Sequence, residues 1–180
     1  MTLPDRSLRS FTGIGYDKGR SVVWQALWFA CQNLIFAKWW CPATVRPKLL
    51  RAFGADIGKR VFIRHQVRVL WPWKLTVGND CWIGEGAWLL NLEPITLGHD
   101  VCLSQEAFLC TGSHDRHSPS FKYDNGPITV GDSAWIGARA TVLRGVTVGQ
   151  RGVVAACARI TKDVPAGALT RGDQTRDPKR

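Results

Sequence analysis

The sequence repeats an aliphatic residue every six positions over most of its 180 residues. A small residue often follows the aliphatic one, and a second restricted position lies four residues after it. The repeating aliphatic residues are Ile57, Ile63, Val69, Val77, Ile83, Leu89, Leu97, Leu103, Leu109, Val130, Ile136, Val142, Val148, Val154 and Ile160. Neither an α-helix nor a simple amphipathic strand has a period of six, whereas short strands joined by tight turns do.

The spacing of the repeats predicts a coil with three faces. Val130 and Val148 are 18 residues apart, which is three repeats, and Val77 and Leu97 are 20 apart because Ile95 and Thr96 are extra residues at one corner. Hexapeptide periodicity is typical of parallel β-helices. We therefore expect an all-β dominated fold in which the aliphatic side chains fill a narrow core. Glycines serve corners that need a positive φ or a close backbone approach.

The pattern divides the chain into three regions. Residues 1–50 form an N-terminal extension with a tryptophan-rich helix, residues 51–168 form the β-helix, and residues 169–180 form a C-terminal tail. The repeats break after His114 and resume at Val130, so residues 116–127 form an inserted loop with turn-forming residues. We expect this loop to cover the bound acceptor; the alternative is an ordinary surface loop.

Residues 21–41 are almost continuously apolar and contain no glycine or proline, which predicts a helix that Pro42 and Pro47 break. The stretch is long enough for a membrane span, although its polar interruptions disfavour one. Its four tryptophans favour a position at a membrane surface. Packing of the helix on the main domain is the third interpretation.

The formal net charge is +10, but the basic residues are dispersed and no nucleic-acid-binding motif is present. A phosphate-bearing ligand or a membrane surface accounts for the charge better than nucleic acid does. The six cysteines form no C-x-x-C pair and several lie inside apolar repeats, which indicates a reducing compartment. The first twenty residues are polar and indicate no signal peptide.

Several segments resemble the hexapeptide-repeat acyltransferases. They are V-G-N-D-C-W-I-G-E-G-A-W at residues 77–88 and V-G-D-S-A-W-I-G-A-R-A-T at residues 130–141. The segments L-C-T-G-S-H-D at 109–115 and I-T-K-D-V-P at 160–165 resemble the sugar O-acetyltransferases, in particular the colanic acid biosynthesis acetyltransferase group. The resemblance implies a left-handed coil, a homotrimer with active sites between subunits, and acetyl-CoA as co-substrate with no bound cofactor.

His114 lies in the segment that resembles this group most closely. Transfer to a sugar hydroxyl requires a base, and a neutral imidazole suits that role near neutral pH. The resemblance implies that His114 is this base; a lone surface histidine is the ordinary alternative. Asn91 and Asp115 are weaker candidates for binding the acceptor or orienting His114, and Asp115 is disfavoured because neighbours in an extended chain point to opposite faces.

The resemblance also assigns the acetyl-CoA site. Trp135 and Ala138 match a segment that lines the pantetheine arm, and Ala156 matches a small residue that lets the coenzyme approach the coil. Thr161 and Lys162 match a pair near the nucleotide end. Coil packing for Trp135 and simple solvation for Lys162 are the alternatives. The backbone amide of Ser113 or Ala138 is a candidate donor to the oxyanion. The tail departs from the family pattern after residue 168, which puts the adenine contacts in doubt.

Three other interpretations remain open. A zinc carbonic anhydrase on the same coil requires three histidines from adjacent subunits, and the chain offers His65, His99, His114 and His117. A non-catalytic trimeric scaffold and an N-acyltransferase acting on an amino sugar are the others. We expect an acceptor from exopolysaccharide biosynthesis, either a sugar or a lipid-linked oligosaccharide. The expected location is the cytoplasm, with peripheral contact at the inner face of a membrane.

Overall fold

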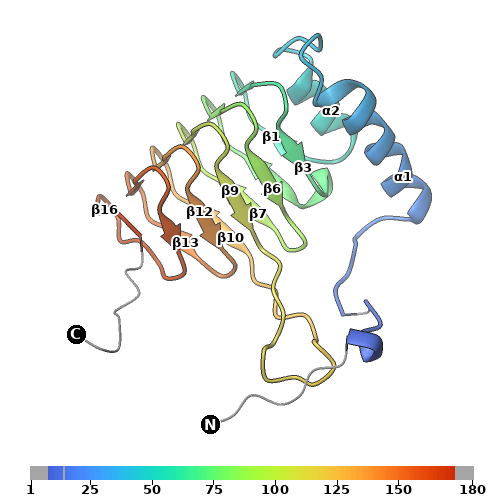
Figure 1. The fold of residues 1–180 in the computed structure, drawn as a ribbon. Coiled ribbons are helices and arrows are strands. Elements are labelled where there is room, and N and C mark those ends of the chain that lie inside the picture. Colours follow the sequence, from blue (N-terminus) through green and yellow to red (C-terminus); the bar gives the residue numbers. More distant parts are fainter. Residues whose placement is uncertain (1–7, 14, 173–180) are drawn as a thin grey trace.

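The chain forms a stack of triangular coils closed at one end by helices (Figure 1). The structure is a computed structural model that describes residues 8–13 and 15–172. Each complete coil contributes one strand to each of three parallel sheets, so the sheets run along the stack and the strands run around it. This is the parallel β-helix that the six-residue period predicts.

The three sheets, here called A, B and C, are visited in that order by every coil. Sheet A contains β1 (Asp56–Ile57), β4 (Leu75–Val77), β7 (Ile95–Leu97), β10 (Ile128–Val130) and β13 (Thr147–Val148). Sheet B contains β2 (Phe62–Ile63), β5 (Trp82–Ile83), β8 (Cys102–Leu103), β11 (Trp135–Ile136), β14 (Val153–Val154) and β16 (Leu169–Thr170). Sheet C contains β3 (Arg68–Val69), β6 (Trp88–Leu90), β9 (Phe108–Cys110), β12 (Thr141–Leu143) and β15 (Arg159–Ile160).

The core consists of the aliphatic repeat residues stacked in register. Val77 pairs with Leu97, Leu97 with Val130, and Val130 with Val148, so one buried row runs through sheet A. Every one of the fifteen repeat positions is at most 6% exposed. The sequence analysis placed the extra pair Ile95 and Thr96 at a corner, and this prediction is wrong. The pair begins strand β7, where Ile95 is fully buried. The longer coil therefore gains core volume.

The repeat glycines are required by close contact between neighbouring coils and not by backbone conformation. A Cβ on Gly78 would lie 2.5 Å from the carbonyl oxygen of Gly98, and a Cβ on Gly137 would lie 2.6 Å from the amide nitrogen of Ala156. Neither glycine has a positive φ. The positive φ falls two residues later in each corner, mostly on non-glycine residues such as Arg60, Asp80 and Glu106.

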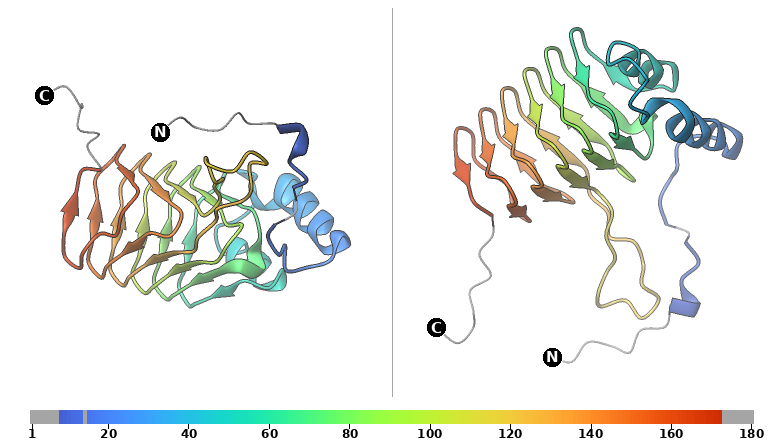
Figure 2. Two further views of the ribbon diagram at one scale, coloured as in Figure 1. Left: turned by 90° about the horizontal axis from the view of Figure 1, so that it is seen from below. Right: turned by 45° about the horizontal axis from the view of Figure 1, so that its top comes forward.

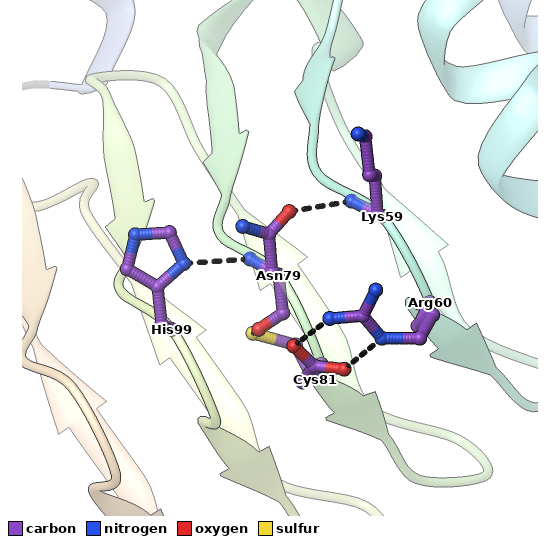
Figure 3. Close-up of polar contacts among 6 residues, drawn as sticks. Lys59, Arg60, Asn79, Cys81 and His99 are labelled. Atoms are coloured by element: carbon purple, nitrogen blue, oxygen red, sulfur yellow. Dashed lines mark hydrogen bonds and ion pairs between the residues drawn. The ribbon is translucent and has the colours of Figure 1, made fainter.

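The corners between sheets A and B carry a row of side chains that link each coil to the next (Figure 3). Asn79 Oδ1 accepts from the backbone amide of Lys59 at 2.7 Å, and His99 Nδ1 accepts from the amide of Asn79 at 3.0 Å. Asp132 Oδ1 continues the row by accepting from the amide of His99 at 2.8 Å. These side chains satisfy corner amides that have no strand partner.

The helices cover the end of the stack next to the first coil (Figure 1, Figure 2). They are α1 (Val22–Cys31), a π-helical turn η2 (Gln32–Phe36) and α2 (Arg46–Ala52). Two 3-10 turns lie elsewhere: η1 (Leu8–Ser10) is in the N-terminal arm, and η3 (Pro72–Lys74) joins β3 to β4. Ser21 caps α1 by accepting from the amide of Trp24. The helix expected over residues 21–41 therefore ends at Phe36, and Pro47 does not break a helix but lies in the first turn of α2.

One face of α1 seals the open end of the core. Trp28 is 1% exposed and donates from Nε1 to the carbonyl of Val69 at 2.9 Å, while Gln32 Oε1 accepts from the Val69 amide at 2.7 Å. The buried Arg46 donates to the carbonyls of Phe36, Lys38 and Ile63, which fixes the turn after η2. Packing on the main domain is therefore confirmed for this face. Within residues 8–13 and 15–172, no helix has the length and apolar character that crossing a membrane requires.

Candidate active site

The regular winding opens after β9, at the corner between sheets C and A of the third coil. The chain leaves the coil as an antiparallel hairpin in which Asp124 donates to Ser113 and Asp115 donates to Lys122 through backbone bonds of 2.9 and 2.8 Å. The insertion is the projecting loop in Figure 1. The sequence predicts that the repeats break after His114, but His114 already lies on the first arm of this hairpin, paired with Tyr123.

The imidazole of His114 is held in an aromatic cluster. Phe121 stacks on it with ring centroids 3.9 Å apart and planes 7° from parallel, and Tyr123 stacks more loosely at 4.9 Å. Phe11 approaches edge-on at 5.2 Å. Three rings around one imidazole restrict its rotation, so its free nitrogen has a fixed direction.

A backbone contact fixes which nitrogen of His114 is free to act as a base. Nδ1 lies 2.7 Å from the carbonyl oxygen of Phe121. A carbonyl oxygen only accepts, so Nδ1 carries the proton and donates it to this bond. In the neutral ring, Nε2 then has an unshared electron pair. The hairpin thus presents the tautomer that general-base catalysis requires.

The N-terminal arm, residues 8–13 and 15–20, reaches this cluster, which the sequence analysis did not foresee. Tyr16 packs edge-on against Tyr123 at 5.2 Å, and Trp73 donates from Nε1 to the carbonyl of Lys18 at 2.7 Å. Figure 1 shows the blue N-terminal segment beside the yellow hairpin. No repeat or charge pattern marks Phe11 or Tyr16 in the sequence, because the contact joins segments a hundred residues apart.

Arg144, which the sequence did not single out, lies at the corresponding corner of the fourth coil. It forms an ion pair with Asp124 at the base of the hairpin. It also lines a hollow of about 300 Å³ together with Gly112, Ser113, Leu143 and Thr161. The hollow therefore extends from the base of the hairpin to Thr161, which follows β15 in the fifth coil.

The residues expected to bind acetyl-CoA lie on both sides of sheet C. Ala138 and Ala156 occupy successive corners before β12 and β15, whereas Thr161 and Lys162 follow β15 on the His114 side. Trp135 lies in sheet B, is 51% exposed and donates from Nε1 to Ser104 Oγ at 2.8 Å. The chain thus brings Thr161 toward His114 but separates it from Ala138 and Ala156.

Asn91 has a structural role in place of the expected contact with the acceptor. Its side chain is completely buried; Oδ1 accepts from the amide of Trp71 at 2.9 Å, and Nδ2 donates to the carbonyl of Trp71 at 2.6 Å. Both polar atoms are therefore engaged in joining the second coil to the first. The expectation that Asn91 contacts acceptor or orients His114 is corrected.

The groups next to His114 have defined partners. Asp115 Oδ1 accepts from the amide of His117 at 2.8 Å, which stabilises the turn of the hairpin. The amide of Ser113 donates to Asn125 Oδ1 at 3.1 Å and is not available to an oxyanion, contrary to one of the two candidates above. The amide of Ala138 donates to no group in the part of the chain that the structure describes.

The remaining histidines lie at different corners. His99 belongs to the row between sheets A and B, His65 lies 3.3 Å from Glu85 at a corner between sheets B and C, and His117 is on the hairpin. Among the described residues, no three His, Cys, Asp or Glu side chains are grouped closely enough to hold a metal ion. A metal site within one chain is thus not formed by these residues.

Comparison with known proteins places this fold in a class. Residues 127–162 match the family described as bacterial transferase hexapeptide, six repeats. A hexapeptide-repeat acetyltransferase from Vibrio cholerae, solved with acetyl-coenzyme A, superposes with a TM-score of 0.75 at 23% identity over 89% of this chain and 90% of its own. A maltose O-acetyltransferase from Clostridium difficile gives 0.75 at 22% identity over 89% of each chain. The chain has the left-handed parallel β-helix fold of these transferases.

A more similar relative is a protein of Escherichia coli named as the colanic acid biosynthesis acetyltransferase WcaF. It is 41% identical over 162 residues, which are 88% of this chain and 87% of the relative. The chain belongs to this colanic acid biosynthesis acetyltransferase family of hexapeptide-repeat enzymes, and it is an acyltransferase. The resemblance seen in the sequence is confirmed.

Proposed function

We propose that this enzyme transfers an acetyl group from acetyl-CoA to a hydroxyl group of a sugar, with Nε2 of His114 as the general base. The observation that carries the proposal is the bond from His114 Nδ1 to the carbonyl of Phe121, which leaves Nε2 as the acceptor. Nε2 removes the hydroxyl proton as the sugar oxygen attacks the thioester carbonyl carbon. The tetrahedral intermediate then breaks its C–S bond, and the imidazolium returns the proton to the departing sulfur.

The acetyl-CoA site in this proposal comprises Trp135, Ala138, Ala156, Thr161 and Lys162. The free amide of Ala138 suits the oxyanion of the intermediate, because a preorganised backbone donor gains most where charge develops. The exposed Lys162 follows the hollow at Thr161 and suits a phosphate of the coenzyme. Asp115 borders the acceptor side through its position next to His114.

The same proposal includes a homotrimer, and two observations support it. Outward positions of sheet A are polar, whereas those of sheet B are apolar or cysteine: Phe62, Trp82, Cys102, Trp135, Val153 and Leu169. Trp82, Trp135 and Leu169 are each more than 50% exposed in the single chain. In addition, His114 and Ala138 lie on opposite sides of sheet C, and a neighbouring copy supplies the missing side of the site. Cyclic symmetry closes such a contact.

Sedimentation equilibrium tests the assembly directly. We expect a mass three times the 20.0 kDa of one chain. The mass of a single chain at enzyme concentrations that support full activity would contradict the shared site.

The acceptor in this proposal is a sugar of an exopolysaccharide or its lipid-linked precursor, because the relative is named for colanic acid biosynthesis. Peripheral contact with a membrane, where lipid-linked acceptors are held, is part of the same proposal. The experiment incubates the protein with acetyl-CoA and a panel of nucleotide sugars and lipid-linked oligosaccharides, and identifies the product by NMR. An O-acetyl ester supports the proposal, an amide on an amino sugar indicates N-acyl transfer, and the absence of acceptor-dependent CoA release contradicts the proposed class of acceptor.

A further inference from the structure

The outer side of the helical cap carries apolar side chains that nothing in the described chain covers. We define the cap surface by its exposed large apolar residues: Val22, Val23, Leu27, Phe29, Leu34, Ile35, Trp39 and Trp40. Trp39 is 80% exposed and Phe29 is 68% exposed. The inner side of the same helix already packs on the coil through Trp28 and Phe36. A helix that is apolar on all sides normally has partners on all sides.

The charges of the cap have one sign. Between Lys18 and Ala55 the sequence has basic residues and no aspartate or glutamate. The basic residues of the segment are Lys18, Arg20, Lys38, Arg46, Lys48 and Arg51, and all except Arg46 are exposed. Exposed cations beside exposed aromatic and aliphatic side chains match an anionic surface with an apolar interior.

Two hollows place cations directly beside the exposed tryptophans. One hollow of about 520 Å³ is lined by Lys38, Trp39 and Arg68, and also by Glu106, whose carboxylate is paired with Arg139. A second, of about 400 Å³, lies between Trp39, Trp40 and Arg64. The guanidinium of Arg64 also lies 3.9 Å from the carboxylate of Glu85, but it remains partly exposed. Indole rings prefer the headgroup level of a bilayer, and basic side chains next to them contact lipid phosphates.

From these observations we infer that the cap surface docks on an anionic phospholipid bilayer, with α1 lying in the plane of the interface. The apolar residues insert at the boundary of the acyl chains, and Lys38 and Arg64 contact phosphate groups. The helix is too short to span, so the attachment is peripheral. The cap lies at the first-coil end of the stack (Figure 2), which leaves the later coils and their acetyl-CoA residues away from the bilayer. This inference rests on the proposed function: it identifies the part of the enzyme that makes the proposed membrane contact and the anionic lipid that this contact requires.

Vesicle flotation tests the inference with the full chain. The probes are vesicles of phosphatidylcholine alone and of phosphatidylcholine mixed with phosphatidylglycerol. We expect binding to the anionic vesicles that weakens at high salt, and little binding to the neutral ones. Leu27→Gln combined with Leu34→Gln should weaken binding about tenfold or more. The matched control is Leu8→Gln, because Leu8 is a similarly exposed leucine of the N-terminal arm that lies outside both the cap surface and sheet B; this variant should bind like the unmodified protein.

Two further measurements keep the inference separate from the proposed function. Lys38→Gln combined with Arg64→Gln should weaken binding to anionic vesicles and reduce the dependence of the residual binding on salt. None of the cap variants should change acetyl transfer to a water-soluble acceptor, so a failure of docking and a failure of catalysis are distinguishable. Absence of vesicle binding by the unmodified protein overturns the inference. A change in the sedimentation mass of the variant with Leu27→Gln and Leu34→Gln would also overturn the inference, because it would show that the cap surface contacts another copy of the chain.

Discussion

At the scale of single residues, the stacking of the coils depends on glycines that lie so close to the backbone of the next coil that no Cβ atom fits. Gly78, Gly84 and Gly137 each place a hypothetical Cβ within 2.6 Å of backbone atoms in the next coil. By contrast, the left-handed position in most corners holds an ordinary residue. The chain therefore accepts a modest conformational penalty there, about 1–2 kcal/mol for a non-glycine residue.

Replacing Gly78 by alanine should be strongly destabilising. The new Cβ would lie 2.5 Å from the Gly98 carbonyl oxygen, and neither coil can move without stretching the hydrogen bonds between strands. We expect urea unfolding to show a loss of about 3 kcal/mol in the free energy of unfolding. Gly145→Ala is the control: it has no atom within 4 Å and a φ of 74°, so it should lose only about 1 kcal/mol. Equal losses for the two variants would refute this explanation.

The residue-scale core was predictable from sequence because the burial pattern has a fixed period. All fifteen repeat aliphatics are buried, as expected. The structural role of Asn91 was not predicted, because the sequence does not show whether a polar residue near a corner faces inward. Its two hydrogen bonds to the backbone of Trp71 are evident only from the structure. The sequence analysis offered two reasons for the repeat glycines, a positive φ and a close backbone approach, and only the second is correct. The sequence could not separate the two reasons, because each of them favours glycine at the same positions.

At the scale of elements, ion pairs tie successive corners together. Arg60 donates to both carboxylate oxygens of Asp80, at 2.5 and 2.6 Å, and Arg139 lies 2.6 Å from Glu106. The hydrogen bond from Arg60 holds the pKa of the Asp80 carboxyl below its usual range, and Arg139 does the same for the pKa of Glu106. Each carboxylate therefore stabilises the fold in its ionised form.

This arrangement predicts a dependence of stability on pH. Because the pKa of Asp80 is lower in the folded chain, its contribution is present above the ordinary carboxyl pKa of about 4 and disappears as pH falls through the folded value. Arg60→Gln should lower the thermal unfolding midpoint at neutral pH, and its midpoint should converge with that of the unmodified protein in acid. A midpoint difference that is the same at every pH would contradict the assignment.

The hairpin should affect catalysis through the orientation of His114. Phe121→Ala removes the ring that stacks on the imidazole at 3.9 Å while the backbone carbonyl remains. We expect kcat to fall about tenfold, with little change in KM for acetyl-CoA, because a misoriented base affects the chemical step. Lys122→Ala, on the same hairpin with an exposed side chain, should behave like the unmodified enzyme. A larger effect on KM than on kcat would indicate a binding role.

The sequence predicted where the insertion falls but not its form. The break in the repeats located the loop within a few residues, and its turn-forming residues were recognised. The pairing of His114 with Tyr123 and the packing of Phe11 were not predictable, because they depend on how the hairpin folds back against the N-terminal arm. Coverage of the acceptor by this loop stays a prediction.

At the scale of the whole molecule, the reactivity of the cysteine thiols indicates whether the coils stay packed together in solution. Cys41 and Cys81 are 2% and 1% exposed, whereas Cys157 is exposed at a corner. Burial raises the pKa of the thiols of Cys31, Cys81, Cys102 and Cys110, which lowers their thiolate population near neutral pH.

We therefore expect one thiol per folded chain to react rapidly with a chromogenic disulfide reagent. The remaining thiols should react only as the protein unfolds. Cys157→Asn should remove the rapid phase, and asparagine tolerates the φ of 60° at that position. Several rapid thiols in the variant would mean that the coils open in solution.

The division of the site between two sides of sheet C is also a property of the whole molecule. The residues carried over from the family resemblance were identified along the sequence, where their distribution around the triangle is not apparent. Only the topology shows that Ala138 and Ala156 precede the sheet C strands while Thr161 and Lys162 follow them. In the proposed trimer, a neighbouring copy would therefore supply the part of the acetyl-CoA site that lies on the other side of sheet C.

The central claim is that His114 is the base of the acetyl transfer, and its most direct test is a comparison of single-turnover rates of acetyl-CoA consumption. His114→Ala and His117→Ala change neighbouring histidines on the same hairpin. The account predicts that His114→Ala slows the reaction by about 10²–10⁴-fold while His117→Ala stays within about twofold. If both variants keep the rate of the unmodified enzyme, or if His117→Ala is the slower of the two, His114 is not the base.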